Sequence, residues 1–205
     1  MRTETTVITT TIYKFDELSD EAKEKFIEEQ RDFEAESSAE EMRECMMRAM
    51  EWMNINIGDY QFDCTGSGYI NLSVDDEAEE LEGVRAYKWI VDNCFSDVDK
   101  KKMYWQKNVD IRSRKSLTSN IESKDWMDNC PFSGWCYDLA VKDAWESWCN
   151  DLREGKSPSV RDFLDELEWA YLKELSDEYY GFDEAVARDI AEANGYEFLE
   201  DGTIY

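Results

Sequence analysis

The spacing of apolar residues changes within this chain, and that change limits the folds it can adopt. On both sides of residues 55–74, apolar residues recur at steps of three and four, which is typical of the buried face of an α-helix. Within 55–74 they alternate with polar residues, as on a half-buried strand, and Thr65-Gly66-Ser67-Gly68 separates two such runs. The sequence therefore predicts a β-hairpin between helices.

Two helices are expected before the hairpin. Ser19 is placed to cap the first. Its inner face would consist of Ala22, Phe26, Ile27, Gln30 and Phe33. Ser38 and Glu41 form the pattern of a capping box, which predicts that the second helix begins there. The buried side of that helix would be Met42, Cys45, Met46, Ala49, Trp52 and Met53. A β-branched run at residues 6–13 predicts a strand ahead of both helices.

More helices are expected after the hairpin. The sequence predicts them at residues 77–95, 131–155, 158–175 and 182–194, with a closing hairpin or final strand at 196–205. Strands and helices do not alternate as they would in a parallel sheet. We therefore expect the α+β class, with an antiparallel sheet packed by several amphipathic helices.

No linker or internal repeat divides the sequence, so we expect a single acidic domain over residues 1–205. Its sub-regions would be a mixed part at 1–99, a basic strand or loop at 100–130, and a mainly helical part at 131–205. The tryptophans of the apolar stripes should be buried, namely Trp52, Trp145 and Trp148.

The charge balance narrows the possible partners. The chain has 23 Lys+Arg against 49 Asp+Glu, a net charge of −26, yet 42% of its residues are hydrophobic. A disordered acidic tail would contain far fewer apolar residues, so this is a folded acidic protein. Its charge repels phosphates, and we expect direct binding to neither DNA nor a membrane surface.

One segment has the opposite charge. Residues 100–124 contain eight bases and two acids (+6), leaving 15 bases and 47 acids (−32) in the other 180 residues. The bases are Lys100, Lys101, Lys102, Lys107, Arg112, Arg114, Lys115 and Lys124. This segment could be a strand that neutralises acidic helices, a contact for phosphate or RNA, or a dimer interface with an acidic face.

The residue types also limit the chemistry. The chain has no histidine, which excludes Ser-His-Asp and Cys-His hydrolysis and HExxH metalloprotease chemistry. Its six cysteines contain no CxxC pair, and we interpret them as reduced, with Cys45, Cys94 and Cys149 as core hydrophobes. The glycines of the Gly66-Ser67-Gly68 turn join strands and open no helix, so they are not a phosphate loop. We therefore expect no catalytic residue, no cofactor and no metal site.

Two groups of acidic residues are candidates for binding a partner. The first is a ladder at helical steps of three and four, which brings carboxylates within about 5–6 Å of one another, near the spacing of phosphates. It consists of Glu21, Glu24, Glu28 and Asp32, and it is the preferred face. The second is Asp75, Asp76, Glu77, Glu79 and Glu80. Acids at a helix start also complement the helix dipole, and Asp75 to Glu77 is the cluster that we would test for a divalent cation.

The two ends of the sequence carry a resemblance. Residues 13–25, YKFDELSDEAKEK, resemble the opening of a family of small acidic phage and prophage proteins, which often begin with FDELSxEAKEKA. Residues 193–205, ANGYEFLEDGTIY, resemble the closing YxFxxDGxxY-like phrase of the same family. The resemblance implies an origin in a phage or mobile element. Members are uncharacterised or loosely labelled antitoxins, and small acidic phage proteins are frequently inhibitors of host defence.

These observations give two hypotheses for function. In the first, the protein is a non-enzymatic inhibitor of a host defence nuclease, of the anti-CRISPR or anti-restriction type, and occupies a basic nucleic-acid groove as a nucleic-acid mimic. In the second, it is an antitoxin that covers the active site of a cognate toxin. With no leader and no apolar run of about 20 residues, we expect it in the cytoplasm of a bacterial host.

Overall fold

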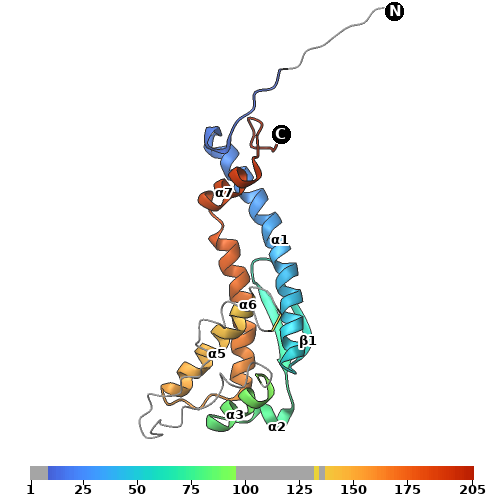
Figure 1. Cartoon of the computed structure of the whole chain (residues 1–205), viewed down its shortest axis with the longest axis vertical. Coiled ribbons are helices and arrows are strands. Elements are labelled where there is room, and N and C mark those ends of the chain that lie inside the picture. The colour runs from blue at the N-terminus through green and yellow to red at the C-terminus, as the bar shows by residue number, and fades with distance from the viewer. Residues whose placement is uncertain (1–8, 96–131, 134–136) are drawn as a thin grey trace, which may run out of the picture. The chain divides into compact units, whose positions relative to one another are not determined.

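A computed structural model describes residues 9–95, 132–133 and 137–205. In that part of the chain it contains six α-helices and a two-stranded antiparallel sheet, so the predicted α+β class is confirmed (Figure 1). The basic segment 100–124 lies outside the described residues, as do Cys130 and Cys136. The contacts divide into two compact units: residues up to Ser37 with Glu178–Tyr205, and Ser38–Asp177. Each unit is described by itself.

The region predicted as two helices is one helix, α1, Asp20–Trp52. Ser19 caps its start, because the Ser19 Oγ accepts a hydrogen bond from the Ala22 amide at 3.2 Å. The prediction of a second start at Ser38 was wrong. A capping residue must leave helical backbone angles, but no glycine or proline occurs between Asp20 and Trp52, and buried Ala35 and Ala39 carry the apolar spacing through this point.

In the Ser38–Asp177 unit, the predicted hairpin is confirmed. Strand β1, Asn56–Phe62, pairs with β2, Gly68–Ser73, with an irregularity between Ile57 and Tyr60. The turn requires glycine at position 66, where φ is +74° and an added Cβ would lie 2.1 Å from the backbone carbonyl oxygen of Leu172.

The helix predicted at residues 77–95 is interrupted. The structure has a single turn, α2, Asp76–Glu79, and a longer helix, α3, Val84–Asn93. Gly83 separates them with a φ of +58°, and its amide donates to the Pro158 carbonyl at 2.9 Å. Glu82 forms an isolated bridge with Ser159, the residue before α6, instead of continuing the helix, which explains the break.

The core of this unit is rich in methionine and aromatic residues. Helices α5, Asp138–Arg153, and α6, Val160–Gly181, contribute buried apolar faces as predicted. Trp145 and Trp148 are buried and stack with ring centroids 5.6 Å apart, whereas Trp52 is only half-buried. The fully buried methionines of α1 and the residue that follows it are Met42, Met46, Met50 and Met53. Cys45, Cys94 and Cys149 are buried thiols, as predicted.

The other unit contains a 3₁₀ turn, η1, Phe15–Glu17, the start of α1 and helix α7, Glu184–Asn194. Its small core includes Phe15, Phe26 and Phe198, whose rings meet edge to face. Phe33, predicted on the inner face of the first helix, is 67% exposed. No described helix is long and apolar enough to cross a membrane.

The predicted N-terminal strand, residues 6–13, is not formed where the structure describes it. Residues 6–8 lie outside the described part, and of residues 9–13 only Tyr13 forms an isolated bridge, with Phe198. The closing segment likewise has one isolated bridge, between Phe198 and Ile204. β-Branched residues favour a strand only where a partner edge is present, and Phe198 is paired by single residues on both sides.

Candidate binding sites on the acidic surface

The nine acidic residues predicted to bind a partner fall into different units. The ladder on α1 belongs to the unit that contains both chain ends, and the cluster around α2 belongs to the Ser38–Asp177 unit. All four ladder residues are exposed, as are Asp75, Asp76, Glu77 and Glu80, whereas Glu79 is half-buried. The two groups are therefore separate candidate sites with different local surroundings.

The ladder is partly occupied by partners from its own unit. Glu24 and Glu28 line a cavity of about 510 Å³ together with Lys23 and Arg31, and Lys23 forms an ion pair with Glu184 at 3.6 Å. Asp32 accepts a hydrogen bond from the Tyr179 hydroxyl at 3.2 Å. The Arg31 guanidinium lies over the ring of that tyrosine, 4.8 Å from its centroid. The cations of this unit therefore offset part of the ladder's charge.

Among the described residues, no cation offsets the charge at the start of α2. Asp75 is the N-cap position and Asp76 and Glu77 form the first turn, but the Asp75 side chain caps no amide. None of the three carboxylates has a hydrogen bond or ion pair among the described residues. They line a cavity of about 750 Å³ whose apolar wall includes Leu81 and Trp89, and no basic residue lines it in the described part of the chain.

Glu79 has a structural role. Its carboxylate accepts a hydrogen bond from the Val74 amide at 3.0 Å and lies 3.9 Å from Arg161. This pair of contacts fastens the end of β2 to the single turn of α2. Glu79 thereby positions the neighbouring acids, and it is not itself free to bind a partner.

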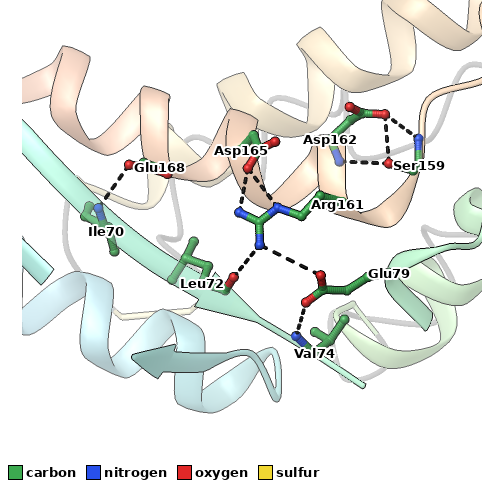
Figure 2. Close-up of polar contacts among 9 residues, drawn as sticks. All are labelled: Ile70, Leu72, Val74, Glu79, Ser159, Arg161, Asp162, Asp165 and Glu168. Carbon is green, nitrogen blue, oxygen red and sulfur yellow. Dashed lines mark hydrogen bonds and ion pairs between the residues drawn. The ribbon is translucent and has the colours of Figure 1, made fainter. Parts of the chain in front are cut away.

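The sequence reasoning missed the side chains that hold this site in place. Figure 2 shows Arg161 of α6 between β2 and α2. Its Nη1 donates to the Leu72 carbonyl at 2.7 Å and its Nε donates to Asp165 at 2.9 Å. Two turns beyond Arg161 on α6, Glu168 accepts a hydrogen bond from the Ile70 amide at 3.0 Å. Side chains of α6 thus form hydrogen bonds with backbone groups on the edge of β2 that does not face β1. Without them, those backbone groups would lack a partner strand.

A second polar cluster is buried in the core of the same unit. Asp138 accepts hydrogen bonds from the Phe132 amide at 2.7 Å and from the Ser133 hydroxyl at 2.6 Å. Burial raises the pKa of the Cys45 thiol, although a hydrogen bond with Ser133 opposes the shift. Burial, with a smaller contribution from Asp138, raises the pKa of Tyr171 well above its ordinary value. Both groups stay protonated, the opposite of what an activated nucleophile requires.

The described residues contain no group of three or more His, Cys, Asp or Glu side chains arranged to hold a metal ion. No family model, curated protein or solved structure matches the chain.

Proposed function

We propose that this protein is a non-catalytic inhibitor that binds a basic, nucleic-acid-binding surface of another protein. An example of such a surface is the nucleic-acid channel of a host defence nuclease in a bacterial cytoplasm. The observation that carries the proposal is the α2 cluster, in which Asp75, Asp76 and Glu77 are exposed beside an apolar wall and have no cationic partner among the residues that the structure describes. Lysine and arginine side chains that normally hold phosphates would fit such a surface.

The geometry favours the α2 cluster over the ladder on α1. In the ladder, Lys23 and Arg31 line the same cavity as the carboxylates, so a basic partner would meet two cations. At α2 the charged side chains that line the cavity in the described ranges are all carboxylates, with Leu81 and Trp89 available for apolar contact. Interfaces of this kind combine charge steering, which speeds association, with a desolvated aromatic anchor, which slows dissociation.

Inhibition by this route is stoichiometric. The protein should be titrated into cleavage reactions of purified CRISPR effectors and restriction nucleases, with binding of target DNA measured in parallel. We expect inhibition that saturates at a fixed molar ratio, loss of DNA binding by the inhibited nuclease, and association that slows as salt is raised, because screening acts beyond about 8–10 Å near physiological ionic strength. Inactivation of excess nuclease by a trace of protein would contradict the proposal.

Charge reversal tests the assigned face. The variant Asp75→Lys, Asp76→Lys, Glu77→Lys should lose inhibition. A matched control has the same change in net charge at exposed acids that have no described partner: Glu40→Lys, Glu51→Lys, Asp189→Lys. The control should keep inhibition apart from slower association. Equal inhibition by both variants would show that the α2 cluster is not the contact surface.

A further inference from the structure

Helices α5 and α6 form a second groove in the Ser38–Asp177 unit. The cavity has a volume of about 700 Å³, and Trp169 of α6 forms part of its wall. Trp169 is 56% exposed, whereas Trp145 and Trp148 on α5 are buried in the core. An exposed tryptophan ring at the edge of a groove offers a large apolar face for contact with another molecule.

The same groove is strongly acidic. Asp162, Asp165 and Glu166 line it together with Trp169, at positions i, i+3, i+4 and i+7 of α6, so they share one face of the helix. Asp151 lies on the α5 side, and Lys156 is the one basic residue that lines the groove in the described part of the chain. The lining therefore contains four carboxylates and one ammonium group.

The carboxylates differ in how far they are already used. Asp151 pairs with Lys156 at 2.5 Å, and Asp162 accepts from the Ser159 amide at 2.7 Å at the start of α6. Asp165 pairs with Arg161. Glu166 has no partner among the described residues. One carboxylate next to the exposed ring thus remains available to a cation.

The ring itself already takes part in a cation–π contact. The ammonium of Lys173, one turn further along α6, lies 5.8 Å from the Trp169 centroid. Tryptophan is the best aromatic partner for a cation, and arginine stacks on it more often than lysine does. A planar guanidinium can also reach a carboxylate with two parallel hydrogen bonds, which an ammonium cannot do.

We propose that this groove binds an arginine of the basic partner, with the guanidinium stacked on Trp169 and paired with Glu166. The inference rests on the proposed function and deepens it, since it names the side chain that the partner inserts. Charge complementarity selects the occupant: an arginine side chain fits the available carboxylate of Glu166 beside the aromatic wall of an acidic groove, whereas an acidic or purely apolar segment does not.

The test uses the full-length protein and two synthetic probes, an eight-residue arginine peptide and an eight-residue lysine peptide. Any acidic protein attracts polycations, so the informative variants keep the net charge unchanged. These are Trp169→Ala, Trp169→Phe and the control Phe33→Ala, which removes another aromatic side chain that is 67% exposed. Because the removed rings are exposed, the variants should fold as the wild type does, and their far-ultraviolet circular dichroism should be the same.

Wild-type protein should bind the arginine peptide more tightly than the lysine peptide. Trp169→Ala should weaken binding of the arginine peptide about fivefold or more and remove the preference for arginine over lysine. The affinity of Trp169→Phe and of Phe33→Ala for the arginine peptide should stay within about twofold of the wild-type affinity. Glu166→Gln should weaken binding of the arginine peptide more than binding of the lysine peptide. Equal affinity of Trp169→Ala and wild type, or equal loss for both peptides, would overturn the proposal.

The two proposals can fail separately. If reversal of Asp75, Asp76 and Glu77 abolishes nuclease inhibition while Trp169→Ala binds the arginine peptide like wild type, the groove assignment is wrong and the proposed function stands. If the preference for arginine depends on Trp169 but no basic nuclease is inhibited, the groove stands and the proposed function is wrong.

Discussion

Replacing Arg161 by methionine should destabilise the Ser38–Asp177 unit by about 2 kcal/mol. The largest contribution is the charged hydrogen bond from Arg161 to the Leu72 carbonyl, 2.7 Å long, for which about 1.5–3 kcal/mol is typical. The side chain is 39% exposed, so water replaces part of that bond and the lower half of the range applies. The ion pair with Asp165 adds only about 0.3–0.5 kcal/mol because it lies on the helix surface.

The matched control is Arg48→Met. Arg48 also lies four residues from its carboxylate partner, Glu44, at 3.5 Å, but it has no hydrogen bond to a strand among the residues described. We expect its loss to cost less than about 0.5 kcal/mol. The two variants carry the same change in charge, so their difference isolates the contacts of Arg161 with β2 and α2.

Urea unfolding measures both free energies. The stacked pair Trp145 and Trp148 reports on this unit directly through near-ultraviolet circular dichroism, because the two rings are buried 5.6 Å apart. We expect a lower transition midpoint for Arg161→Met with an unchanged slope. If Arg161→Met and Arg48→Met unfold at the same midpoint, Arg161 does not hold the edge of β2, and the explanation of how α2 is positioned is wrong.

Other changes should have effects of predictable sign. Gly66→Ala should cost about 2 kcal/mol or more in urea unfolding, because φ is +74° there and the Leu172 carbonyl lies 2.1 Å from the added Cβ, whereas Gly181→Ala, with open space around it, should be neutral. Burial raises the pKa of Cys94 from 9.0 to about 12. Its contribution to stability is therefore complete below pH 9 and falls by about 1.4 kcal/mol per pH unit as the pH rises from 9 to 12, so Cys94→Ala should flatten the alkaline stability curve. An equally steep curve in that variant would refute the assignment to Cys94. Phe198→Ala should remove about 3–5 kcal/mol from the unit formed around Phe15 and Phe26, detected by proteolysis near the chain ends, and leave the dichroism of Trp145 and Trp148 in place.

Periodicity predicted those parts of the fold that local spacing determines. The hairpin, the methionine stripe of α1 and helices α5, α6 and α7 follow from steps of two or of three and four along the chain. The errors came from short signals that the wider context overrode. The Ser38 and Glu41 pattern lies within a helix, and Gly83 breaks a pattern that otherwise continues as a helix.

The positioning of the candidate site could not be predicted in the same way. Arg161 and Leu72 are 89 residues apart in sequence, and nothing local to either residue indicates that they meet. The same holds for Glu168 and Ile70. What the sequence does show is the spacing of Arg161, Asp165 and Glu168 on one side of a helix, and the structure shows that this side faces the edge of β2.

The structure separates the acids of this protein by what they do in the folded chain. Asp32 and Glu79 hold groups of their own unit, through Tyr179 in one case and through Val74 and Arg161 in the other. Within the described part of the chain, the side chains of Asp75, Asp76 and Glu77 hold no such group. The helix dipole gives them little stabilisation, because α2 has a single turn and the Asp75 side chain caps no amide. These three carboxylates place negative charge on one exposed turn. A partner that supplies cations would pair with them, which is why the proposed contact with a basic surface is centred on this turn.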